Sequence, residues 1–200
     1  MNIYIDLDDT LIHSVYGRGR NPGRRTVVNV TEDEIYHSML RPEASRILGE
    51  LRKIGNVRML TTAISDYAEA HNRVFSLGFL ESEIFARERY ISKVLLAYGS
   101  EWVASMTRTD PGALLIDNLS PSTESSRTKC AFLGIGEDNY LQIREFDGKD
   151  PACFVEEVDS LLAAVTRRAR GEGADAESGI LSRAEGGMGD RSAPQGAARL

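Results

Sequence analysis

The sequence of 200 residues has no apolar run of the length that a membrane span needs. A spanning helix takes about 20 consecutive, mostly apolar residues. The first residues also lack the basic segment and apolar stretch of a secretory signal. We therefore expect a protein without membrane spans, and a cytoplasmic location.

Cysteine is also scarce, and acidic residues outnumber basic ones by 30 to 24. Cys130 and Cys153 are the two cysteines, without CxxC spacing or a nearby pair of histidines, which argues against a disulfide framework or a zinc site. The formal net charge of −6 argues against a general nucleic-acid coat. The hydrophobic share of 42% still allows a substantial core, and the length suits one domain with extensions.

The first apolar segment ends in a cluster of acids. Ile3, Ile5 and Leu7 form a short buried strand pattern, and the carboxylates of Asp6, Asp8 and Asp9 crowd its end. Each carboxylate raises the cost of ionising its neighbours, so such a cluster often marks a cation site or a reaction. A solvated acidic turn is the alternative.

Two later segments, one mostly and one wholly apolar, are also followed by polar residues. The segment 57–60 is followed by Thr61 and Thr62, and the segment 113–116 by Asp117 and Asn118. Short apolar strands that alternate with helices indicate an α/β fold, a Rossmann-like parallel sheet with helices on both faces. Because ligands bind beyond the carboxyl ends of such strands, we expect these side chains in one crevice with Asp6 and Asp8.

The remaining segments predict further elements. Residues 26–30 and 35–40 read as a small hairpin after the first strand, preceded by a loop with Arg18, Arg20, Arg24 and Arg25, which either attracts an anionic substrate or is solvated. We expect residues 94–106 to be helical, residues 130–133 to form a fourth strand, and the last helix to start near Asp150. Polar composition predicts a domain at 1–166 and a disordered tail at 167–200.

These groups suit phosphoryl transfer. Asp6 and Asp117 offer the oxygen ligands that Mg²⁺ prefers, and a carboxylate can attack phosphorus to form an aspartyl phosphate. A second acid, Asp8, is placed to protonate the leaving oxygen and later to activate water. Thr61 offers a hydroxyl, and Lys93 a cation, for the charge on the phosphoryl group.

The run Asp6-Leu7-Asp8-Asp9-Thr10 resembles the DxDxT signature of the haloacid dehalogenase (HAD) superfamily, and in particular its branch of small RNA polymerase C-terminal-domain phosphatases. The later marks of that branch follow in order over residues 2–135: Arg41-Pro42, Thr61 with Tyr67-Ala68, and Asp117-Asn118.

The resemblance implies a Mg²⁺-dependent phosphomonoester hydrolase, and it implies roles for individual residues. Asp6 would be the nucleophile and a metal ligand, Asp8 the general acid/base and a ligand through its carbonyl, and Asp117 the last ligand. The phosphoryl group would be bound by Thr61, with the adjacent Thr62 as the competing choice, and by Asn118 and Lys93; Arg87 and Arg89 are the alternatives to Lys93.

One departure concerns the small inserted sheet of that branch. The run 67–114 reads as mostly helical here, so we expect a minimal cap. The expected partner is a phosphorylated substrate, which is a protein, a nucleotide or polynucleotide end, or a small molecule. Two other functions stay open: a non-catalytic module that binds a phosphorylated partner, and a phosphotransferase to an acceptor other than water.

Overall fold

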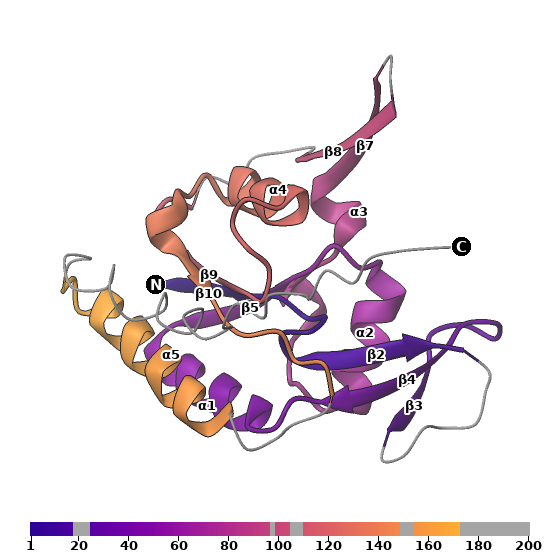
Figure 1. The fold of residues 1–200 in the computed structure, drawn as a ribbon, viewed down its shortest axis with the longest axis horizontal. Helices are drawn as coiled ribbons and strands as arrows, with labels where there is room; N and C mark the ends of the chain where they lie inside the picture. Colours follow the sequence, from indigo (N-terminus) through magenta and orange to yellow (C-terminus); the bar gives the residue numbers. More distant parts are fainter. Residues whose placement is uncertain (18–24, 97–98, 105–109, 149–153, 173–200) are drawn as a thin grey trace, which may run out of the picture.

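A computed structural model describes residues 1–17, 25–96, 99–104, 110–148 and 154–172. The described part is built around a five-stranded sheet with the order β10-β9-β1-β5-β6, in which every neighbouring pair is parallel (Figure 1). The strands are β1 (Asn2–Ile5), β5 (Asn56–Leu60), β6 (Ile84–Phe85), β9 (Leu114–Asp117) and β10 (Tyr140–Gln142). The chain runs outwards from β1 to β5 and β6 and then crosses to β9 on the other side of β1. The strand order therefore switches direction at β1, and ligands bind at such a switch point in parallel sheets.

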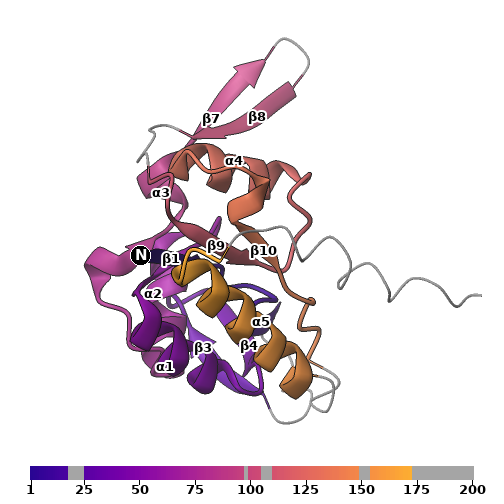
Figure 2. The same cartoon turned by 90° about the vertical axis from the view of Figure 1, so that its left-hand side faces the viewer.

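Helices cover both faces of this sheet (Figure 2). Ile3 and Ile5 point into a core that includes residues of α1 (Ala44–Ile54), α2 (Ser65–Val74) and α5 (Phe154–Ala169). Tyr4 points the other way, into a second core beneath α4 (Glu124–Leu133). Because side chains alternate along a strand, this arrangement explains why β1 is apolar from residue 3 to residue 5. The expected α/β fold is confirmed.

A smaller antiparallel sheet follows β1 and has the order β2-β4-β3 (Figure 1). The expected hairpin is present as β3 (Thr26–Asn29) and β4 (Ile35–Leu40), and β2 (Ile12–Tyr16) pairs with β4 as a further strand. Of the arginine-rich loop, residues 18–24 lie outside the described part. The Arg25 guanidinium donates to the His37 carbonyl at 3.5 Å.

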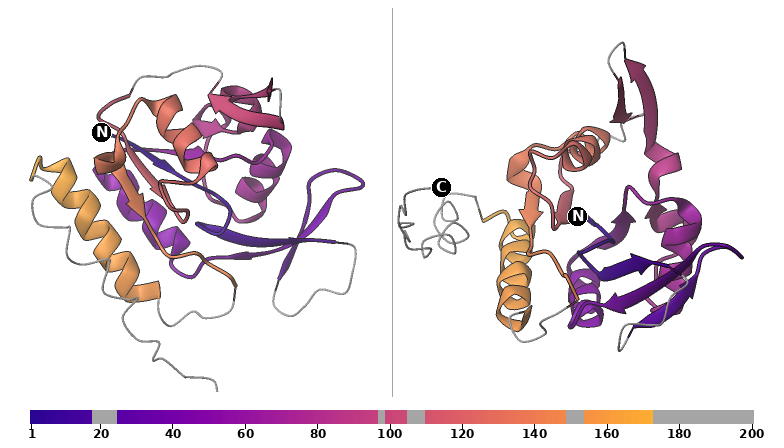
Figure 3. Two further views of the ribbon diagram at one scale, coloured as in Figure 1. Left: turned by 45° about the horizontal axis from the view of Figure 1, so that its top comes forward. Right: turned by 45° about the vertical axis from the view of Figure 1, so that its right-hand side comes forward.

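The helix expected over residues 94–106 is wrong for the described residues 94–96 and 99–104, and residues 97–98 and 105–106 lie outside the described part. The chain forms a short helix, α3 (Arg87–Tyr90), and then a hairpin of β7 (Ile91–Leu96) and β8 (Gly99–Ala104), which projects from the body of the protein (Figure 3). Pairing sets Val94 against Glu101 and Ser92 against Val103. The β-branched residues and Trp102 favour strands, and this preference prevails over the helical reading of the apolar residues.

The expected strand at 130–133 is also wrong, because these residues are the last turn of α4. The Thr123 hydroxyl caps the helix by accepting from the Ser126 amide at 3.3 Å, and Gly134 ends it with a left-handed φ of 68°. The position next to β9 at the edge of the sheet is instead taken by β10.

The C-terminal part is described as far as residue 172. Helix α5 runs to Ala169, past the boundary expected at residue 166, and residues 173–200 of the expected tail lie outside the described part. Within the described residues, no helix is both long enough and apolar enough to cross a bilayer.

Candidate active site

The register of the parallel sheet brings the polar strand ends together. Ile5 lies opposite both Met59 and Ile116, and the Asp6 amide donates to the Ile116 carbonyl at 2.9 Å. Asp6 and Asp117 therefore occupy neighbouring positions at the carboxyl edge of the sheet. Both side chains are buried. Thr61, which follows β5, is buried at the same edge.

A lysine that the sequence analysis did not select joins these two carboxylates. The Lys129 ammonium lies 2.7 Å from Asp6 Oδ1 and 2.8 Å from Asp117 Oδ2. Its side chain is 1% exposed, which is rare for a lysine unless the charge is paired. Lys129 is on α4, whose buried side contains residues 126, 129, 132 and 133. Reading this segment as a helix would have shown a lysine at helical spacing on a buried face.

The acids of the site are held in an environment that resists their ionisation. The pKa of Asp6 is raised to about 7, chiefly by burial and also by the charge of Asp117, against the lowering effect of Lys129. Burial also raises the pKa of Asp8. Burial alone would lower the pKa of Lys129, but the charges of Asp6 and Asp117 raise it above its usual value, so the lysine stays protonated at neutral pH. Three carboxylates and one ammonium leave the site short of positive charge.

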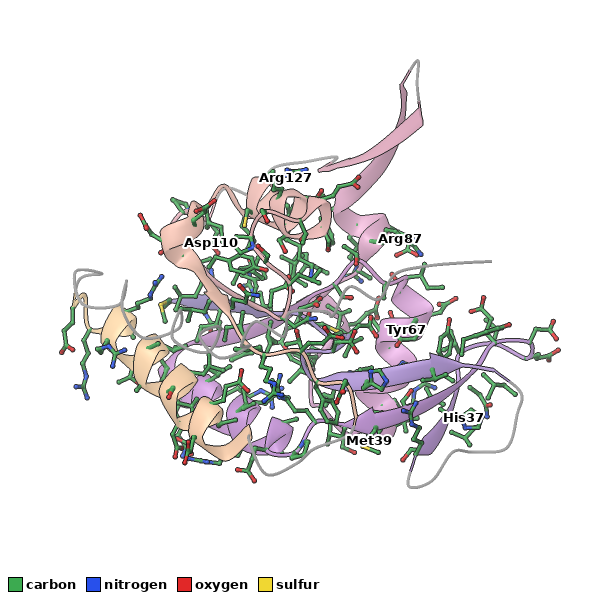
Figure 4. All side chains as sticks on the ribbon, in the orientation of Figure 1. His37, Met39, Tyr67, Arg87, Asp110 and Arg127 are labelled. Atoms are coloured by element: carbon green, nitrogen blue, oxygen red, sulfur yellow. The ribbon has the colours of Figure 1, made fainter. Side chains whose placement is uncertain are left out.

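Asp8 is oriented by a tyrosine. The Tyr67 hydroxyl donates to Asp8 Oδ1 at 2.5 Å, and Figure 4 shows Tyr67 on α2 beside the β2 strand. The Tyr67 ring packs edge-to-face against Tyr36, with 4.8 Å between the ring centroids, and at a tilt against His71, with 4.1 Å between the centroids. His71 is fixed in turn by Ser38, whose hydroxyl lies 2.8 Å from Nε2. The small sheet and α2 thus hold the phenol that contacts Asp8.

The turn after Asp8 is anchored from two sides. The Thr10 hydroxyl lies 3.0 Å from the Asn118 side-chain amide and accepts from the Asn118 backbone amide at 3.1 Å. With its nitrogen turned towards this turn, the Asn118 side chain also donates to the Asp8 carbonyl at 3.2 Å. The buried Arg41 guanidinium donates to the Thr10 carbonyl at 2.9 Å and to Glu157 of α5 at 3.1 Å.

The other expected site residues lie as follows. The Thr61 hydroxyl accepts from the Ala63 amide at 3.1 Å, whereas Thr62 is only half-buried. Lys93 is on β7, opposite Trp102, and its side chain lies outside the described part. Arg89 contacts Glu81 through the carbonyl at 2.9 Å. Arg87 lies on α3 (Figure 4).

The donor set at the edge of the sheet fits Mg²⁺. Among the described residues no group of three or more His, Cys, Asp or Glu side chains is arranged to hold a metal ion. Mg²⁺ keeps several waters, however, and is often bound by only one or two carboxylates. Asp6 and Asp117 converge on one ammonium, and the Asp8 carbonyl lies within 3.2 Å of the Asn118 amide between them. The residues that would hold the ion are Asp6, Asp117 and, through its carbonyl, Asp8.

Comparison with known proteins places this chain in a family. The chain matches the model of the NLI interacting factor-like phosphatase family over residues 2–165, and it therefore belongs to this family. No curated protein matches the chain.

Two solved structures are similar at low identity. Fission yeast RNA polymerase II CTD phosphatase Fcp1 bound to beryllium fluoride aligns with a TM-score of 0.45 and 12% identity, over 86% of this chain and 52% of that one. Fcp1, described as an essential RNA polymerase II CTD phosphatase, aligns with a TM-score of 0.47 and 13% identity, over 84% of this chain and 50% of that one. The chain spans about half the length of these proteins.

Proposed function

We propose that the protein is a Mg²⁺-dependent phosphomonoester hydrolase that works through an aspartyl phosphate on Asp6. The observation that carries the proposal is the convergence of Asp6 and Asp117 on the buried Lys129 ammonium, at 2.7 and 2.8 Å, where the DxDxT turn meets the end of β9. A site of this kind stabilises the charge of a phosphoryl group in a water-poor environment.

The reaction proceeds in two steps. An Asp6 oxygen attacks phosphorus, the bond from phosphorus to the ester oxygen breaks, and Asp8 donates its proton to the leaving alcohol. Water then attacks the phosphorus of phospho-Asp6 while Asp8 accepts a proton from that water. The bond from phosphorus to the Asp6 oxygen breaks, which releases inorganic phosphate and restores the Asp6 carboxylate. The raised pKa of Asp8 favours the protonated form that the first step needs.

Lys129 is the cation that we assign to this reaction, in place of Lys93. Its ammonium contacts the proposed nucleophile and carries a charge that both carboxylates stabilise. Thr61, at the carboxyl edge of the sheet, and Asn118, beside the Asp8 carbonyl, are the proposed polar ligands of the phosphoryl group. Mg²⁺ at Asp6, Asp8 and Asp117, when bound, would supply positive charge that keeps the carboxylates ionised and offsets the charge of the phosphate.

The substrate class that we propose is a phosphorylated protein. Family membership and the net charge of −6 support this choice over a polynucleotide, whose binding needs basic surface. A phosphorylated nucleotide end and a small phosphorylated metabolite are the comparison substrates.

The test is phosphate release by the purified protein from p-nitrophenyl phosphate, phosphoserine peptides, nucleotides and 5′-phosphorylated oligonucleotides, with and without EDTA. Asp6→Asn is the blank. Asp9→Asn is the matched control, because Asp9 is in the same turn but contacts His13, at 2.7 Å, and Asn tolerates its left-handed φ of 53°. We expect Asp9→Asn to stay active and Asp6→Asn to lose activity. Equal activity of Asp6→Asn and the unmodified protein would refute the proposal.

A further inference from the structure

The hydroxyl of Tyr90 is buried without a partner. Tyr90 is the last residue of α3, its side chain is 0% exposed, and its hydroxyl oxygen makes no hydrogen bond within the described residues. Buried tyrosine hydroxyls usually have a partner, because leaving a donor unsatisfied costs free energy. An orphan donor of this kind is available to an acceptor that lies outside the described part of the chain, such as a bound ligand.

The position of Tyr90 puts this donor on the side of the sheet that holds the site. Its ring packs against Phe132 at 4.9 Å, and Phe132 is about one turn after Lys129 on α4. Tyr90 also belongs to the core cluster that contains Tyr4 and Leu115. Tyr4 and Leu115 each lie two residues before an acid of the site, and residues two apart on a strand share a face.

The electrostatics of the phenol agree with this placement. Burial raises the pKa of Tyr90, and the negative charges of Asp6 and then Asp117 raise it further. The hydroxyl therefore keeps its proton at neutral pH and can donate. The Tyr90 hydroxyl does not bond either carboxylate among the described contacts. Lys129 contacts Asp6 Oδ1 and Asp117 Oδ2, and the Leu119 amide donates to Asp117 Oδ1 at 2.9 Å.

We propose that Tyr90 is a further ligand of the phosphoryl group, and that its hydroxyl donates a hydrogen bond to a phosphoryl oxygen held at Asp6. This inference rests on the proposed function, since the acceptor is the tetrahedral oxyanion of the substrate. The phenol adds a neutral donor beside Lys129, and its rigid, buried ring holds that donor in place before the substrate arrives.

Tyr140 supplies a matched control from the same part of the molecule. It is a second buried tyrosine, but its hydroxyl is satisfied: it donates to the Leu119 carbonyl at 2.9 Å and lies 2.8 Å from the Ser126 hydroxyl. Replacing Tyr140 by Phe removes hydrogen bonds that the folded protein makes. Replacing Tyr90 by Phe keeps the ring against Phe132 and removes a hydroxyl that has no hydrogen-bond partner among the described residues.

The experiment compares Tyr90→Phe and Tyr140→Phe with the unmodified protein in three measurements. These are kcat/KM for a phosphoserine peptide, the Kd of inorganic orthovanadate by calorimetry, and the urea midpoint of unfolding. For Tyr90→Phe we expect kcat/KM to fall about tenfold or more, vanadate to bind about tenfold more weakly, and the midpoint to stay the same or rise. For Tyr140→Phe we expect a lower midpoint and a smaller change in vanadate binding.

Two outcomes would overturn the inference. In one, Tyr90→Phe keeps kcat/KM and the vanadate Kd within twofold of the unmodified protein. In the other, it loses as much stability as Tyr140→Phe, which would show that its hydroxyl serves the fold. If the unmodified protein hydrolyses no phosphomonoester, the proposed function fails, and the vanadate measurement still decides whether Tyr90 binds a tetrahedral oxyanion.

Discussion

Replacing Lys129 by Met tests the central feature of the site. The side chain keeps a similar length and loses its charge, so Asp6 and Asp117 are left facing each other without the ammonium at 2.7 and 2.8 Å. We expect lower stability and lower activity together, because the same ammonium pairs the carboxylates in the free protein and would face the phosphoryl group in the proposed reaction.

The magnitude follows from the burial of all three groups, which are 5% exposed or less. Removing one partner of a buried ion pair costs about 3–5 kcal/mol, because the remaining charge stays buried and unpaired. Part of this cost disappears when a carboxylate takes up a proton, so we expect a loss of about 3 kcal/mol in the free energy of unfolding at neutral pH. Removing one preorganised positive group from a phosphoryl site lowers kcat by about 100-fold or more.

The assay is urea unfolding followed by circular dichroism, with kcat measured on p-nitrophenyl phosphate. Lys53→Met is the control, because Lys53 lies 2.6 Å from Glu50 but is 70% exposed. Exposed pairs of this kind contribute about 1 kcal/mol at most. Mg²⁺ should raise the unfolding midpoint of Lys129→Met more than that of the unmodified protein, since the carboxylates have lost their other cation. A Lys129→Met protein as stable and as active as Lys53→Met would refute the reasoning.

Three further predictions concern groups around the site. Arg41→Met should lose about 3 kcal/mol in urea unfolding, because Glu157 and the carbonyls that Arg41 bonds lose a buried partner; a loss below 1 kcal/mol would contradict this. Burial lowers the pKa of His71 in the folded protein from its usual value of 6.5. At a pH below 6.5 the unfolded chain therefore binds more protons at this residue than the folded protein does. Stability should therefore fall as the pH drops below about 6.5, by at most about 1.4 kcal/mol per pH unit, and His71→Gln should lack this part of the slope in urea titrations at several pH values. Tyr67→Phe frees Asp8 from its donor, so kcat should fall about tenfold for a phosphoserine peptide and less for p-nitrophenyl phosphate, whose leaving group needs little protonation; equal losses on both substrates would argue against a role through Asp8.

The sheet and its polar edge could be predicted because their signals are local. Each of the strands β1, β5 and β9 is short and mostly apolar, and it ends at or just before the residues of interest. The rule for parallel sheets then places those ends together. Asp6, Asp117 and Thr61 are buried at that edge as expected. Their chemical roles remain predictions.

Lys129 could not be predicted in the same way, because its importance depends on tertiary packing. Residues 130–133 are a short apolar run, and such a run fits a buried strand as well as the last turn of a helix. The reading as a strand took this segment out of the helix that turns Lys129 inwards. The hairpin of β7 and β8 is the reverse case: its sequence fits the pattern of a helix, but its β-branched residues lie on two paired strands. In both segments the sequence pattern is short enough to fit two periods.

The hydrogen bonds of Arg41 bear on how the protein folds during its synthesis. The turn that follows Asp6 and Asp8 is tied through this guanidinium to Glu157, a residue more than 100 positions further along the chain. During synthesis on the ribosome, the segments for β1, β5 and β9 emerge long before Glu157 does. The nascent chain can therefore pair most of its central sheet while the turn still lacks its last anchor. We expect hydrolytic competence to arrive late, with α5, so that incomplete chains carry the acids of the site without a finished catalyst.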